Sequence, residues 1–254
     1  VILADEQAEM GGSLLAERTA TIDGVSATQW VAGTLATLAG RANVTLLPRT
    51  TAFGYYNHNH VVLTERVPDH LERPDPKLPR ERLWQVRPQE VVIATGAHER
   101  PLSFADNDRP GIMLAESVRV YINRYGVAPG RRIGFATNGA SAYAAAADAK
   151  AAGLDVTIVD TRPESAIGPE KALAAGIEIL AGHTVVGSTG GKGLTGLIVA
   201  PFTAGKGVGA RRTLPCDCAG ISGGWTPSVH LHSQSRGKLA FRPEIDAFVP
   251  GISV

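Results

Sequence analysis

The chain has 254 residues, 44% of them hydrophobic, and its 25 Lys and Arg against 24 Asp and Glu give a formal charge of +1 at pH 7. This length suffices for one large or two moderate domains, so neither disulfides nor metals are needed for stability. Nucleic-acid binding relies on clustered Lys and Arg, so the near-neutral balance argues against that partner. No run of about 18 apolar residues and no signal peptide is present, which predicts a soluble cytoplasmic protein without a membrane.

The first part of the chain alternates strand patterns with one helix pattern. Val1–Ala4 is an apolar run that predicts a strand, and two acids follow it. Ser26 and Gln29 make a capping box for an amphipathic helix over 27–40. Further strands are expected at 44–47 and, as a hairpin turning at 57–59, at 50–56 and 61–65.

A charged excursion separates these strands from the next ones. Residues 65–82 contain four prolines and ten charged residues, so they favour a solvated loop. Strand character resumes at 83–86 and at 91–95, the second as a buried strand that runs into Thr95 and Gly96. A helix is expected over 115–125, and Pro129-Gly130 indicates a linker.

A second unit of about 30 residues with β-α-β order follows the linker. It consists of a strand at 132–137, a helix at 141–152 and a strand at 155–160. A helix near 169–175 and strands at 177–180, 183–188, 194–200 and 211–214 complete this unit. Residues from Cys216 onward are typical of a return to the first unit. We therefore predict a three-layer α/β domain of residues 1–129 and 215–254, interrupted by a Rossmann-like domain of residues 130–214.

The first unit carries the candidate cofactor site. An acid after an apolar strand, here Asp5 or Glu6, can accept both hydroxyls of an adenosine ribose. Gly11, Gly12 and Ser13 allow backbone amides to approach a ligand, and Thr95-Gly96 lets the chain pass close to one. Each feature also has a plain structural interpretation, as a strand end, a Gly-Gly turn or strand-to-loop packing.

The glycine-rich phosphate loop of such folds, which comes about 20 residues before the acid, is not in this sequence. We therefore expect the chain by itself to bind NAD poorly, because that loop supplies the amides that hold the pyrophosphate. The strand edge that the missing first strand would leave exposed is expected to favour self-association of the chain.

The second unit carries an incomplete nucleotide fingerprint. Its three glycine positions fall on Thr137, Gly139 and Ala142, so only the middle glycine is retained, together with the acid Asp160. This pattern favours a Rossmann-like scaffold with weak or no nucleotide binding, and binding by this unit is the open alternative.

No catalytic residue or metal site is predicted. Cys216 and Cys218 are too close in sequence for an ordinary bridge or a C-x-x-C redox pair, so they are interpreted as structural thiols in a reducing compartment. His58/His60 and His230/His232 form i, i+2 pairs on strands, without the further acids or thiols that zinc requires.

Four segments together resemble the alpha subunits of heterotetrameric sarcosine oxidases. They are DEQAEMGGSLL, VVIATGAHERPLSFADNDRPGIMLAESVRVYINRYGVAPGRR, FATNGASAY and CDCAGISGGWTPSVHLHSQSRGKL, and they span nearly the whole chain. The resemblance implies the FAD/NAD(P)-binding Rossmann-like fold of the glutathione-reductase-like superfamily, with two dinucleotide domains. With it we assign Gly223 and Gly224, in SGGWTPSVHL, to the cofactor site.

The resemblance also implies an activity, which belongs to a multi-subunit enzyme. Such an enzyme acts on CH–NH donors with oxygen as acceptor and oxidatively demethylates sarcosine to glycine, with hydrogen peroxide as a product. NAD is then expected in this subunit, FAD and FMN in the complete enzyme, and tetrahydrofolate in a domain outside this chain. The beta, gamma and delta subunits are the expected partners.

The sequence departs from the family pattern in several places. It matches the middle of a longer subunit, and Cys218 and His232 stand where apolar residues are expected. Alternative functions are an NAD(P)H-dependent flavin reductase that uses the inserted unit, an opine or amino-acid oxidase subunit, and a non-catalytic nucleotide-holding scaffold. The choice between sarcosine and another secondary amine is also left open.

Overall fold

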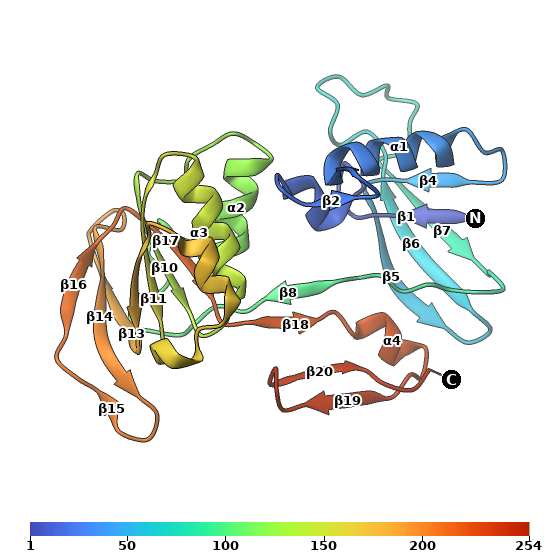
Figure 1. Cartoon of the computed structure of the whole chain (residues 1–254). Coiled ribbons are helices and arrows are strands. Elements are labelled where there is room, and N and C mark those ends of the chain that lie inside the picture. The colour runs from blue at the N-terminus through green and yellow to red at the C-terminus, as the bar shows by residue number, and fades with distance from the viewer. Residues whose placement is uncertain (254) are drawn as a thin grey trace. The chain divides into compact units, whose positions relative to one another are not determined.

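The computed structural model describes residues 1–253 and groups them into two compact units (Figure 1). Unit 1 joins residues 1–96 with the residues from Pro227 onward, and unit 2 comprises Ala97–Thr226. The sequence predicted the boundaries at residues 130 and 214. The structure instead includes residues 97–129 and 215–226 in unit 2, because each of these stretches contributes a strand to the central sheet of that unit.

Unit 2 is built on a five-stranded parallel sheet with the strand order β12-β11-β10-β17-β9. The strands are β9 (Ile112–Leu114), β10 (Arg132–Thr137), β11 (Asp155–Asp160), β12 (Glu178–Ala181) and β17 (Cys218–Ser222). Strand β17 is buried along its length and pairs with β10 on one side and β9 on the other. A central parallel strand needs hydrogen-bonding partners on both sides. The residues after Cys216 therefore complete the sheet of unit 2. The prediction that the chain returns to the first unit at Cys216 is wrong.

Two further layers cover this sheet (Figure 1). Helices α2 (Ala115–Asn123) and α3 (Ser141–Ala151) lie on one face, where Phe135 and Tyr143 are fully buried. The antiparallel strands β13 (His183–Thr189), β14 (Gly196–Thr203) and β16 (Arg212–Pro215) lie on the other, around Leu197 and Val199. Burial of apolar side chains on both faces is the main stabilising contribution in such a unit. The remaining elements are β8 (Ala97–Glu99), η2 (Glu164–Ala166), η3 (Pro169–Ala174), β15 (Gly207–Val208) and β18 (Trp225–Pro227).

Unit 1 begins with a short parallel pair and a capped helix. Strand β1 (Ile2–Ala4) pairs with β4 (Thr45–Leu47). Ser26 caps helix α1 (Ala27–Ala39): its hydroxyl accepts the Gln29 amide, and the Gln29 side chain accepts the Ser26 amide. This is the capping box that the sequence predicted. The other elements of this part are η1 (Gly12–Ala16), β2 (Thr21–Ile22) and β3 (Val25–Ser26).

The rest of unit 1 is mainly antiparallel. The predicted hairpin is present as β5 (Thr50–Tyr56) and β6 (His60–Arg66), and β7 (Glu81–Val86) adds a third strand. The excursion predicted for 65–82 is confirmed over residues 67–80, which contain no strand and are mostly exposed, whereas its ends at 65–66 and 81–82 belong to β6 and β7. The unit ends with α4 (His230–Gln234) and the hairpin of β19 (Leu239–Arg242) and β20 (Ala247–Pro250).

Two local predictions in unit 1 are wrong. Residues 91–95 are not a strand, and Val92 is 91% exposed rather than buried. β-branched residues form a strand only against a neighbour that offers free backbone groups, and no strand in residues 1–253 pairs with this segment. His230 and His232 lie on the helix α4 and not on a strand, and His232 is buried with its ring bonded to the Lys238 carbonyl.

Both cysteines are free thiols buried in unit 2. Burial raises the pKa of Cys216 to about 11 and that of Cys218 to about 12, because it disfavours the thiolate. Both are therefore neutral core residues at physiological pH. Among residues 1–253, no helix is long and apolar enough to cross a membrane.

Replacing Ser26 by Ala should lower the free energy of unfolding by about 1 kcal/mol, the usual loss when a helix cap is removed. Ser26→Thr keeps the hydroxyl and should lose much less. Urea unfolding followed by circular dichroism measures both variants. Equal losses in the two would show that the hydroxyl does not stabilise α1.

Candidate functional site

The acidic turn after β1 is the candidate cofactor-binding edge of unit 1. The amide of Asp5 donates to the Leu47 carbonyl at 3.0 Å, and its carbonyl accepts the Thr50 amide at 2.8 Å. Its carboxylate oxygen Oδ1 accepts the Gln7 amide at 2.9 Å, which orients the side chain. Asp5 is partly exposed. The structure therefore presents one oriented carboxylate at the carboxyl end of a parallel strand pair.

Glu6 follows with an exposed side chain, and the guanidinium of Arg66 donates to its backbone carbonyl at 3.1 Å. Arg49 and Arg66 are neighbours of this turn that sequence reasoning missed. Arg49 donates its amide to the Gln7 carbonyl at 2.8 Å. Both arginines are far from the acids in the chain, and only the pairing of β1 with β4 and its contact with β5 could have indicated them.

The Gly11-Gly12-Ser13 turn opens the short helix η1. Gly11 and Gly12 have φ of 141° and 55°, a region that side chains disfavour. A Cβ on Gly11 would lie 2.9 Å from Leu15 and 3.0 Å from Val31, whereas nothing lies within 4 Å of one on Gly12. Gly11 is thus required by packing on α1, and Gly12 and Ser13 are left facing open space.

Thr95 and Gly96 are held by a segment much later in the chain. The Thr95 hydroxyl donates to the Ser228 carbonyl at 2.9 Å, and the Ser228 amide donates to the Gly96 carbonyl at 2.9 Å. Both residues are exposed, and Gly96 has φ of 66°. The acidic turn, the glycine turn and Thr95-Gly96 are therefore three parts of unit 1, each held by different neighbours.

Gly223 and Gly224 lie in unit 2 and have a structural explanation. Gly223 donates its amide to the Arg100 carbonyl at 2.6 Å, and Gly224 accepts the Arg100 amide at 2.8 Å. A Cβ on Gly223 would lie 2.9 Å from the Pro101 carbonyl oxygen. Close passage of the Arg100 backbone thus requires this glycine without any ligand.

A buried polar cluster that sequence reasoning missed lies beside these glycines. The carboxylate of Glu99 accepts the Glu116 amide at 2.8 Å, and the hydroxyls of Ser141 and Ser222 are 2.8 Å apart. Burial raises the pKa of Glu99, and hydrogen bonds from Ser222 and the Glu116 amide oppose that rise. These residues come from four separate elements, so no local sequence signal could have joined them.

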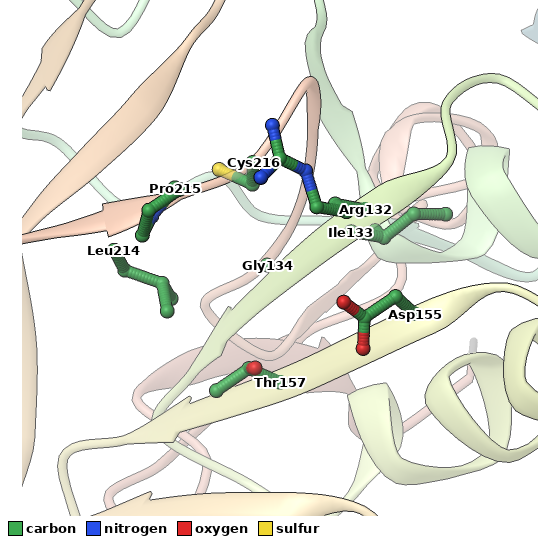
Figure 2. A pocket seen from close by; sticks show the side chains of 8 residues that line it. All are labelled: Arg132, Ile133, Gly134, Asp155, Thr157, Leu214, Pro215 and Cys216. Carbon is green, nitrogen blue, oxygen red and sulfur yellow. The ribbon is translucent and has the colours of Figure 1, made fainter.

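One small pocket lies in unit 2 at the opposite end of the sheet (Figure 2). Its cavity volume is about 20 Å³, far below the ~300–1,000 Å³ usual for small-molecule sites. It is lined by Arg132, Ile133, Gly134, Asp155, Thr157, Leu214, Pro215 and Cys216. Ligands of open α/β sheets bind outside the carboxyl ends of the strands. Arg132 and Asp155 are instead the first residues of β10 and β11, at the amino ends of these strands. This pocket therefore does not match a dinucleotide site. No group of three or more His, Cys, Asp or Glu suited to a metal occurs in residues 1–253.

Solved structures with a similar fold are FAD/NAD(P)-binding Rossmann-like oxidoreductases, as the sequence predicted. L-Proline dehydrogenase from P. horikoshii has a TM-score of 0.72 at 18% identity, over 99% of this chain and 42% of that chain. T. acidophilum thioredoxin reductase has a TM-score of 0.67 at 15% identity, over 94% and 73%. Identities this low establish the fold alone. No family model matches the chain.

Three curated proteins are similar to the chain in sequence. The sarcosine oxidase alpha subunits of Corynebacterium sp. (strain P-1) and Corynebacterium sp. (strain U-96) are 42% and 39% identical over 257 residues, which is 100% of this chain and 27% of each relative. The alpha subunit of Rhizobium meliloti (strain 1021) is 40% identical over 259 residues, 99% of this chain and 24% of the relative. The chain spans about a quarter of the length of these relatives. It is therefore similar along its whole length to part of the sarcosine oxidase alpha subunit, which confirms the resemblance that its motifs indicated.

Proposed function

We propose that the chain is the NAD-binding portion of the alpha subunit of a sarcosine oxidase, a multi-subunit flavoprotein oxidoreductase. The observation that carries this proposal is 39–42% identity to three such subunits along essentially the whole chain. The Rossmann-like fold supports a dinucleotide as the bound group. The proposed partners are the beta, gamma and delta subunits.

The acidic turn of unit 1 fits the ribose of NAD. A ribose offers two neighbouring hydroxyl donors, and a carboxylate has about four lone-pair sites. The Gln7 amide takes one site on Asp5 and orients the group, and Asp5 is partly exposed. We propose Asp5 as the main ribose acceptor and Glu6 as its neighbour, with Gly11, Gly12, Ser13, Thr95 and Gly96 lining the same site.

The proposed reaction converts sarcosine, oxygen and water to glycine, formaldehyde and hydrogen peroxide. A hydride equivalent leaves a methyl C–H bond and a proton leaves the nitrogen, so that the C–N bond becomes an imine. Water hydrolyses the imine to glycine and formaldehyde, and oxygen takes up the two electrons and two protons as hydrogen peroxide. FAD and FMN would supply the electron transfer in the complete enzyme. Where tetrahydrofolate is bound, in a domain outside this chain, it would take up the one-carbon unit in place of its release as formaldehyde. The proposed role of this chain is to bind NAD and contribute to the assembly, without a catalytic residue.

Asp5→Ala should weaken NAD binding by about 1 to 3 kcal/mol, the range for losing hydrogen bonds to a charged group. The measurement is the NAD content of the assembled enzyme after release by acid. Asp75→Ala is the matched control, because Asp75 also accepts the amide two residues on, from Lys77 at 2.9 Å, but lies in the exposed excursion. Unchanged NAD content in both Asp5→Ala and Glu6→Ala would remove this assignment.

The chain by itself should not oxidise sarcosine, because the flavin chemistry is proposed to reside with the partner subunits. A peroxide assay on the chain purified with and without the beta, gamma and delta subunits measures this. Sarcosine-dependent peroxide is expected only from the assembly. Peroxide from the chain alone would contradict the proposed division of roles, and a faster rate with another secondary amine would identify a different substrate.

A further inference from the structure

Unit 2 has the outline of a second dinucleotide-binding fold, but its own side chains already hydrogen-bond the groups that a ligand would use. We infer that unit 2 is closed to NAD and FAD, so that the nucleotide is left to unit 1. The inference rests on the proposed function only for the identity of that nucleotide. Three groups carry it: the fingerprint acid Asp160, the middle fingerprint glycine Gly139, and the buried carboxyl group of Glu99.

The acid at the ribose position is fully engaged inside the protein. Asp160 ends β11, where a dinucleotide fold needs an accessible carboxylate, but its side chain is 0% exposed. Its Oδ1 accepts the amide of Arg162 at 2.9 Å and Nε of Arg162 at 3.1 Å. Its Oδ2 accepts Nη2 of Arg162 and the hydroxyl of Tyr143, each at 2.8 Å. Since a carboxylate has about four lone-pair sites, these four donors leave none for a ribose.

Arg162 is itself held firmly in this arrangement. Its Nη1 donates to Glu170 in η3 at 2.7 Å, and its guanidinium lies 5.9 Å from the centre of the Tyr143 ring. Burial and the neighbouring Asp160 raise the pKa of Tyr143, so its hydroxyl stays a donor at neutral pH. Removing Arg162 from Asp160 would leave a buried carboxylate without its cation, which is strongly unfavourable.

The pyrophosphate position is closed by Thr137. In an open fold the middle glycine offers its amide to the phosphates at the start of the helix. Here the Gly139 amide donates to the Thr137 hydroxyl at 3.1 Å, and the same hydroxyl donates to the Gly139 carbonyl at 3.1 Å. Ser141, the first residue of α3, is bonded to Ser222. The residue that replaces the first glycine therefore also occupies the amide of the second.

A buried carboxyl group lies near the same edge of the sheet. Glu99 is buried, and its carboxylate accepts the Glu116 amide in the first turn of α2. This is the favourable place for a negative group at a helix start. The Glu116 amide is therefore already occupied by Glu99 and is not available to a phosphate at this edge.

Gly139→Ala tests the inference without disturbing the fold. Nothing lies within 4 Å of the added Cβ, and the backbone there is not left-handed. Hydrogen exchange of the assembled enzyme is measured with and without millimolar NAD, and separately with added FAD. We expect ligand-dependent protection only in unit 1, around Asp5. We also expect Gly139→Ala to change affinity less than about twofold, whereas in an open unit the methyl group would weaken binding about tenfold or more.

Gly191→Ala, another unit 2 glycine with open space at the Cβ position, is the matched control. Ligand-dependent protection of β10, α3 or β11 that is lost in Gly139→Ala and kept in Gly191→Ala would overturn the inference. Absence of protection in both units would contradict the proposed NAD binding while supporting the closure of unit 2. The two failures are thus distinguishable.

Discussion

Parallel pairing of β10 with both β11 and β17 is the constraint on which unit 2 depends. It aligns the last residues of the three strands, so that Thr137 lies opposite Asp160 on one side and Ser222 on the other. All three side chains are buried, with exposed fractions of 1%, 0% and 0%. Because buried polar groups need hydrogen-bonding partners, this edge requires either a ligand or donors and acceptors of its own. The chain supplies them through Arg162, Tyr143, Gly139 and Ser141.

The same sequence feature, an apolar strand ending in an acid, has a different role in the two units. In unit 1 the acid Asp5 is partly exposed and is oriented by one backbone amide. In unit 2 the acid Asp160 is enclosed by a guanidinium and a phenol hydroxyl. The difference lies in the neighbours, because an arginine two residues after Asp160 returns to pair with it. A carboxylate keeps its capacity to bind a ribose only where the protein leaves its lone pairs available.

Local patterns predicted much of the fold, and long-range pairing explains what they missed. Strands β10 and β11 and the capping box of α1 follow from nearby residues alone, and their predicted positions are confirmed. The strands that pair with β17 do not follow from nearby residues, because Ala219 of β17 pairs with Ile112, far earlier in the chain. The predicted strand at 91–95 fails for the same reason, since its apolar residues do not reveal whether a partner strand is present. At the site, Asp160 was recognised as the ribose-type acid, but its engagement by Tyr143 and Glu170 depends on how α3 and η3 pack.

The central claim is that only unit 1 is open to a dinucleotide, and a crystal structure of the assembled enzyme at saturating NAD tests it most directly. The account predicts an adenosine ribose on Asp5 and an unchanged network of Thr137, Asp160 and Arg162. A nucleotide bound at the carboxyl ends of β10 and β17, with Thr137 turned away from Gly139 and Arg162 displaced from Asp160, would contradict it.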